Sequence, residues 1–175
     1  ESSAASDVYK RQEIGHRALE YFLPDMWQGQ YLREILLKHQ DAFQAGHPYP
    51  DSFYNSLCYG GDYHQQSEDT HWGRFVKVSF DYINENYPQP WDEPVEKLVA
   101  FLFGVISHQV ADISWHGLEG LHEGFIPVLG NLNFGGSYGD AHNYGDVADD
   151  MIGIVEWIYY GENNQITEDL INECA

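Results

Sequence analysis

The chain has 175 residues, of which 43% are hydrophobic and 15% aromatic. This suits one domain with a substantial core and excludes a compositionally disordered chain. The 28 acidic residues against 8 basic ones give a formal charge of −20, which disfavours partners such as nucleic acid and anionic membranes. An anionic substrate remains compatible with this charge, because bound divalent cations can reverse its sign locally.

In chain order, residues 1–12 show no apolar periodicity and are expected to be a non-native or disordered extension, followed by a single domain over residues 13–175. Helical spacing of apolar residues predicts five helices and a short sixth one: residues 13–23, 28–45, 70–86, 95–115 and 140–160, then a helix from Thr167. The segment 47–69 is expected to be a long loop, a type that is usually functional or disordered.

The helix over residues 95–115 is apolar nearly all round, which is typical of the centre of a bundle. No strand-like alternation persists along the chain, so the sequence predicts an all-α fold, a helical bundle. No apolar run reaches the roughly 18 residues that span a membrane, and no signal peptide is visible. Cys58 and Cys174 form no CxxC motif, and the sequence leaves their pairing open.

Polar residues with metal-ligating side chains interrupt the most apolar helix. His108, Asp112 and His116 follow one another at steps of four, and His142 and Asp146 repeat this spacing on the fifth helix. A step of four advances a helix by about 40°, so His108 and Asp112 project from one side and can bind one ion, while His116, about 80° round from His108, can serve a different ion nearby. Imidazole and carboxylate at this spacing are suitable zinc ligands.

Simpler interpretations exist for each of these residues. A single His-x-x-x-Asp pair on a helix is usually an exposed pair. Two such pairs, one of them on a buried-looking helix and extended by a third histidine, place the metal hypothesis level with this simpler interpretation. By the same reasoning His16 could be a core histidine, Asp51 a turn residue after a proline, and His71 a residue near a helix N-terminus. The remaining histidines are predicted to be surface or loop residues: His39, His47, His64 and His122.

A resemblance to a known family favours the metal hypothesis. Six segments are similar, in the same order, to the catalytic domain of the glycosylphosphatidylinositol-specific phospholipase D family: EIGHRALEYF, HQDAFQAGHPYPDSFY, THWGRF, YINENYPQPW, EKLVAFLFGVISHQVADISWH and GSYGDAHNYGD. They cover most of residues 13–160. The wider superfamily includes zinc-dependent phospholipases C and single-strand nucleases, so the resemblance implies a helical bundle of the zinc-dependent phospholipase C type. Residues 13–175 would be its catalytic domain, either truncated at the C-terminus or from a short relative of the family.

The resemblance also implies the roles of individual residues and a cofactor, namely up to three zinc ions. His71, His108 and Asp112 would hold the first ion, and His116, His142 and Asp146 the second. His16 and an oxygen of Asp112 would hold the third. Asp51 matches the loop acid that orients or deprotonates the attacking water.

The expected function is hydrolysis of the inositol phosphate linkage of glycosylphosphatidylinositol anchors with release of phosphatidic acid. Partners would be anchored proteins or phospholipids, and the location secreted or extracellular. One alternative is a phospholipase C or a single-strand nuclease on the same scaffold, although nucleic acid fits the acidic charge poorly. An alternative of another class is a non-catalytic, zinc-stabilised module that binds lipid anchors.

Overall fold

The computed structural model describes residue 12 and residues 14–19, 27–54 and 63–159, excluding the side chains of residues 27, 28, 150 and 153–159. Within these ranges the regular elements are helices, and an isolated bridge joins Leu118 and His122. The all-α prediction is therefore confirmed. The chain divides into two compact units, and the boundary between them along the chain falls between Gly124 and Phe125.

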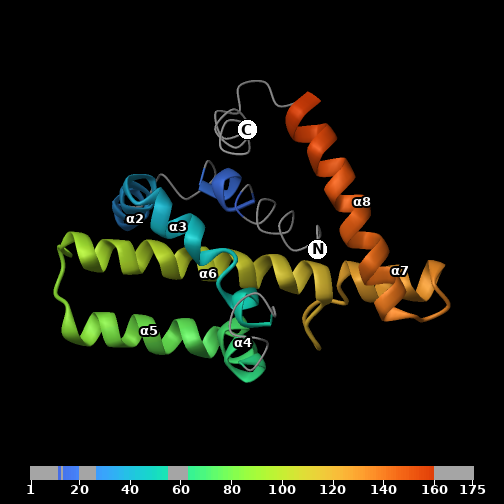
Figure 1. Ribbon diagram of the computed structural model, residues 1–175. Helices are drawn as coiled ribbons and strands as arrows, with labels where there is room; N and C mark the ends of the chain where they lie inside the picture. Colours follow the sequence, from blue (N-terminus) through green and yellow to red (C-terminus); the bar gives the residue numbers. More distant parts are fainter. Residues whose placement is uncertain (1–11, 13, 20–26, 55–62, 160–175) are drawn as a thin grey trace. The chain divides into compact units, whose positions relative to one another are not determined.

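The larger unit contains most of the helices (Figure 1). Residues 14–19 are helical, and the named elements are α2 (Trp27–Lys38), α3 (Gln40–Gly46), the 3-10 helix η1 (Pro50–Phe53), α4 (His64–His71), α5 (Gly73–Asn86) and α6 (Glu93–His116). The smaller unit contains α7 (Phe125–Asn133) and α8 (Tyr138–Tyr159), which pack against each other.

Helix α6 is the centre of the larger unit, as its apolar sequence predicts. Asp92 caps its N-terminus by accepting a hydrogen bond from the backbone N–H of Val95 at 3.2 Å. Gly117 ends it with a φ of 87°, a conformation that favours glycine. Helices α2, α3, α4 and α5 all pack against α6, and α5 runs beside it in the opposite direction (Figure 1).

By length and mean hydropathy alone, α6 could cross a membrane. The sequence expectation concerned an uninterrupted apolar run, whereas this measure is an average over 18 residues that tolerates a few polar ones. Core helices of soluble proteins pass the same test. Val99, Leu102 and Val105 of α6 are fully buried in the larger unit, and 33% of the 18-residue window is buried in all.

The predicted helix over residues 28–45 is two helices that meet at His39. The hydrogen bonds from His39 N to Ile35 O and from Phe43 N to His39 O, both 3.0 Å, continue the helical pattern through the junction. The backbone bends at His39, with φ −119° and ψ 52°. The buried His39 ring lies 2.9 Å from Glu96 of α6, so the prediction of a surface or loop position is wrong for His39.

Helices α4 and α7 differ from the sequence prediction. Part of the expected loop over residues 47–69 forms η1 and α4, and His71 ends α4 instead of belonging to the helix that follows. Trp72 is extended, with φ −115° and ψ 150°, and separates α4 from α5. Helix α7 occupies part of a segment that the sequence left without a helix.

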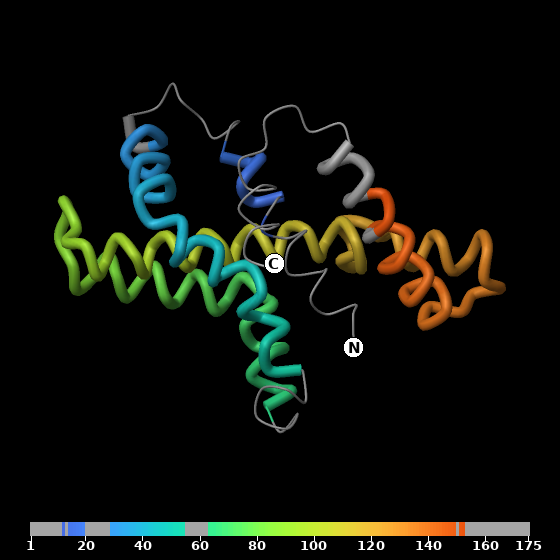
Figure 2. The backbone as a smooth tube through the Cα atoms, turned by 45° about the horizontal axis from the view of Figure 1, so that its top comes forward, coloured from blue at the N-terminus to red at the C-terminus, as the bar shows by residue number. Residues whose placement is uncertain are grey.

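The segment between α3 and α4 is held against the central helices by aromatic contacts. The Tyr49 ring lies 5.2 Å from that of Phe53, 6.3 Å from that of Phe75 on α5 and 4.9 Å from that of Phe101 on α6. Figure 2 shows this segment, in cyan, continuing from α3 past α6. The aromatic anchor fixes the course of the backbone that carries Asp51.

Several predictions fall outside the described residues. These are the character of residues 1–11, the environments of Cys58 and Cys174, and the helix from Thr167.

Candidate metal centre

The candidate site is built first on α6. His108 and Asp112 are one helical turn apart, and His108 Nε2 lies 3.3 Å from Asp112 Oδ2. The His108 side chain is completely buried, and that of Asp112 is 16% exposed. Burying an imidazole and a carboxylate in this apolar helix is costly unless both have partners. The residues of other elements that contact His108 and Asp112 therefore show how this cost is offset.

His71 joins this pair from the last turn of α4. Its Nε2 lies 3.6 Å from Asp112 Oδ2, and its ring meets that of His108 edge to face at a centroid distance of 4.9 Å. Its Nδ1 lies 2.7 Å from the carbonyl oxygen of Ser67, one turn earlier in α4. A carbonyl can only accept, so Nδ1 donates, and the Nε2 of neutral His71 carries the lone pair.

His108 is oriented in the same way by a residue far away in sequence. Its Nδ1 donates a hydrogen bond to the backbone carbonyl of His47 at 2.6 Å. The lone pair of the neutral ring is again on Nε2. Within the described part of the chain, this buried Nε2 has no hydrogen-bond partner. A fixed tautomer with its lone pair directed at other ligand atoms is the usual arrangement of a metal-ligating histidine.

Asp51 reaches the same point from the 3-10 helix η1. Its Oδ1 lies 3.0 Å from His71 Nε2 and 3.8 Å from His108 Nε2. Ligand atoms of Asp51, His71 and His108 all lie within 4.8 Å of one another, a grouping that could hold a metal ion. Ser67 supports the grouping, because its hydroxyl donates to the carbonyl of Pro50 and ties α4 to η1. The structure thus brings together four of the predicted site residues.

The charges of this cluster suit a divalent cation. Two carboxylates face two imidazoles that coordinate when neutral, which leaves a local charge of −2. Burial lowers the pKa of His71, but the hydrogen bond to Asp51, the Ser67 carbonyl and the nearby carboxylates together raise this pKa above its ordinary value. The surroundings that favour a proton on His71 Nε2 would equally favour a cation beside it.

Tyr54 covers one side of His71. The two ring centroids are 5.2 Å apart, and the Tyr54 hydroxyl donates to Glu68. Burial raises the pKa of Tyr54, and the hydrogen bond to Glu68 raises it further. Tyr54 is therefore a neutral phenol at the edge of the site.

The second predicted pair lies on α8 in the smaller unit. His142 Nδ1 is 2.8 Å from Asp146 Oδ2, so the predicted pairing along the helix is present. Tyr138, one turn earlier, places its ring 5.8 Å from that of His142. The Asp146 side chain is mostly buried, at 13% exposure, whereas that of His142 is one-third exposed.

His16 and His116, the remaining predicted ligands, belong to the larger unit. His16 lies in the helical residues 14–19, and its Nδ1 is another buried atom without a hydrogen-bond partner in the described structure. His116 is the last residue of α6. The assignment of these two residues to particular ions stays a prediction.

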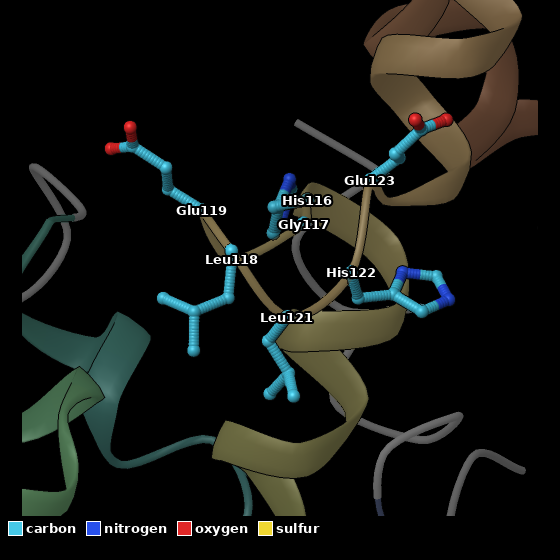
Figure 3. Close-up of a pocket in the computed structure, with 8 residues that line it drawn as sticks. His116, Gly117, Leu118, Glu119, Leu121, His122 and Glu123 are labelled. Carbon is cyan, nitrogen blue, oxygen red and sulfur yellow. The ribbon is translucent and has the colours of Figure 1, made fainter.

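His116 lines a pocket of about 530 Å³ together with the loop that follows α6 (Figure 3). The loop folds back on itself, because Leu118 N donates to His122 O at 2.8 Å and His122 N donates to Leu118 O at 3.0 Å. Glu119 and His122 point to opposite sides of the loop (Figure 3). The pocket places open space beside one predicted ligand.

Sequence reasoning missed the residues that support the ligands. His47 lies outside the helices, as a loop residue is expected to, but it is completely buried and its carbonyl holds His108. Ser67 was assigned to a loop, but it is buried in α4 and contacts both His71 and Pro50. Both act on a ligand through backbone carbonyls or a hydroxyl, and no residue type marks such a role. For Ser67, its position four residues before His71 was the available signal.

Comparisons with known proteins identify the family to which the chain belongs. The family described as "Zinc dependent phospholipase C" matches residues 12–174. A human phosphatidylinositol-glycan-specific phospholipase D is 52% identical over 145 residues, which are 83% of this chain and 17% of the relative. The rat protein of the same name is 50% identical over 155 residues, which are 89% of this chain and 18% of the relative.

A more distant relative has the same name. A phosphatidylinositol-glycan-specific phospholipase D of Dictyostelium discoideum is 42% identical over 106 residues, which are 61% of this chain and 11% of the relative. The chain thus spans less than a fifth of the length of these relatives. No solved structure matches the chain at significant similarity.

Proposed function

Because the chain belongs to the zinc dependent phospholipase C family, we propose that it is the helical catalytic part of a zinc-dependent phosphodiester hydrolase. The proposed substrate is the inositol phosphate linkage of a glycosylphosphatidylinositol anchor, as the names of the relatives suggest. The proposal includes a secreted or extracellular location, because anchored proteins are displayed on the outer surface of cells.

One observation carries the proposal, namely the convergence of Asp51 with three candidate zinc ligands. His71, His108 and Asp112 would hold one ion, and two imidazoles with one carboxylate leave room for a fourth, exchangeable ligand. The donor set fits zinc, since both histidines have their Nδ1 atoms anchored on carbonyls and their Nε2 atoms directed at the carboxylates.

The other predicted ligands extend this proposal to as many as three ions. His116, His142 and Asp146 would hold a second ion, and His16 with Asp112 a third. Support for these assignments is the short His142–Asp146 contact and the buried Nδ1 of His16. When bound, zinc supplies positive charge that lowers the pKa of water towards about 7 and stabilises the negative charge of the reacting phosphate.

Asp51 is the residue that we assign to the attacking water. Its side chain is 41% exposed, compared with 16% for Asp112, so it borders solvent on one side and the histidines on the other. A carboxylate in this position can accept a hydrogen bond from water and take its proton. The water oxygen then bonds to phosphorus, the bond from phosphorus to the inositol oxygen breaks, and that oxygen leaves with a proton. Phosphate stays on the lipid as phosphatidic acid.

The test is hydrolysis of a lipid-labelled glycosylphosphatidylinositol in detergent with added zinc, followed by lipid chromatography. We expect phosphatidic acid from the wild-type chain and very little from Asp51→Asn. Asp69→Asn is the matched control, because Asp69 is an exposed acid of α4 that pairs with Gln65 at 3.1 Å. Release of diacylglycerol would show cleavage on the other side of the phosphorus. Hydrolysis of single-stranded DNA without a lipid product would overturn the proposal.

A further inference from the structure

We infer that His47 is a positioning residue that links the candidate ligand His108 to the helical residues that carry His16. This inference rests on the proposed function, in which both histidines bind zinc. Its basis is that the backbone and the side chain of His47 contact two different helical segments. The backbone carbonyl holds the His108 ring, and the imidazole packs against Gly15.

The carbonyl contact fixes the rotation of the His108 ring. His108 Nδ1 donates to His47 O at 2.6 Å, and both side chains are completely buried. Rotating the ring about its axis or withdrawing the carbonyl would leave a buried donor unpaired, which is costly. The direction of the Nε2 lone pair of His108 therefore depends on where the backbone of His47 lies.

The imidazole of His47 fixes that backbone in turn. Its Nδ1 donates to the carbonyl of Phe43 at 2.8 Å, and its ring meets the Phe43 ring edge to face at 4.6 Å. With Nδ1 committed to α3, the opposite edge of the ring faces Gly15. A Cβ atom on Gly15 would lie 1.8 Å from His47 Nε2 and 2.6 Å from Cε1. The space beside His47 thus admits only glycine at position 15.

His16 follows directly on this contact. Because the His47 ring lies against the backbone of Gly15, any shift of the ring must move the backbone that carries His16, or separate from it. One buried side chain therefore sets both the orientation of His108 and the position of the residues before and including His16. In the proposed enzyme, His47 would fix the position of His108 relative to His16 without binding either ion.

The test is a double-mutant cycle at positions 15 and 47, read out by zinc content and by zinc affinity in a competition assay with a chelator. We expect Gly15→Ala and His47→Ala each to weaken zinc binding about tenfold or more, as outer-shell substitutions commonly do. In the His47→Ala background, Gly15→Ala should have little further effect, because the space vacated by the ring accommodates the methyl group. Gly73→Ala is the matched control, since a Cβ there meets nothing within 4 Å.

A second readout separates positioning from stability. The absorption spectrum of bound cobalt reports the geometry of its ligands, so Gly15→Ala should alter this spectrum even where cobalt saturates the protein. Should Gly15→Ala fail to fold, the double variant should fold, because it lacks the clash, and it should bind zinc as weakly as His47→Ala alone. The inference would be overturned if Gly15→Ala kept the zinc affinity and the cobalt spectrum of the wild type. It would also be overturned if the double variant lost as much zinc affinity as the two single variants together. Neither result depends on which phosphodiester the protein cleaves.

Discussion

Gly46 at the end of α3 and Gly104 in the middle of α6 bring the two backbones into direct contact. A Cβ on Gly46 would lie 2.1 Å from the carbonyl oxygen of Phe101, and a Cβ on Gly104 would lie 2.2 Å from the carbonyl oxygen of Phe43. His47 follows Gly46, and His108 lies one turn after Gly104. The glycine contact therefore sets the distance over which the His47 carbonyl reaches His108.

Substituting one of these glycines should disturb both stability and metal binding. We expect Gly104→Ala to force α3 and α6 apart, at a cost of about 1–3 kcal/mol, and to lower zinc affinity by moving the His47 carbonyl. Thermal unfolding and zinc titration measure the two effects. Gly139→Ala is the control, because a Cβ there meets no atom within 4 Å. An unchanged zinc affinity in a destabilised Gly104→Ala would show that the contact serves packing alone.

Removing a ligand should remove metal. His108→Asn leaves a side chain too short to replace Nε2, so elemental analysis should find about one zinc ion fewer per chain than in the wild type. His142→Asn should have the same effect through the proposed second site. His64→Asn is the comparison, since His64 lies on the surface of α4 with its Nε2 3.8 Å from Glu68. Protein purified without chelator and free of zinc would contradict the metal assignment.

Asp51→Asn should separate binding from turnover. The amide keeps the shape of the side chain but cannot take a proton, and His71, His108 and Asp112 remain. We expect most of the zinc to stay bound, while the turnover falls by about 10²–10⁴-fold. A wild-type rate in Asp51→Asn would exclude Asp51 from the reaction. Loss of zinc instead would make Asp51 a ligand.

Glu96 gives the larger unit a pH-dependent contribution to stability. The hydrogen bonds from Lys38 and His39 lower the pKa of the Glu96 carboxyl below its ordinary value. A carboxyl with a depressed pKa in the folded state stabilises the fold above its unfolded pKa, and this contribution is lost as pH falls through the folded value. Denaturant unfolding should therefore show the wild type losing its advantage over Glu96→Gln between about pH 5 and pH 3.

The control for this pH dependence is Glu93→Gln. Glu93 pairs with Lys97 on the exposed face of α6, with 63% of its side chain exposed. Its replacement should change the pH profile of unfolding much less, because exposed pairs of this kind contribute little. If the free energy of unfolding depended on pH in the same way in Glu93→Gln and Glu96→Gln, the pH dependence could not be assigned to Glu96.

The sequence predicted best what a single helix determines. The apolar run of α6 predicted a central helix, and the four-residue step from His108 to Asp112 predicted two side chains that the structure places 3.3 Å apart. The contact between His142 and Asp146 followed from the same spacing. These features depend on the geometry of one helix, so they need no knowledge of the tertiary structure.

The structural features that the sequence could not predict depend on contacts between different helices. Helix α4 has the sequence HQQSEDTH, which has no apolar period, because its buried face is made of Ser67, Thr70 and His71. The bend at His39 depends on a partner in α6, and the role of the His47 carbonyl depends on a backbone atom that every residue has. Such features emerge only when distant segments meet.

The four clustered side chains come from η1, α4 and α6, and the first and last differ by 61 positions in the chain. During synthesis, Asp51 and His71 leave the ribosome well before His108 and Asp112 exist, so an early nascent chain carries only one of the three proposed ligands of the first ion. Capture of zinc must then coincide with the docking of α6, a step of high contact order. Ribosome-stalled chains that end before His108 should be digested by protease equally with and without zinc, and protection by zinc should begin only once Asp112 has emerged.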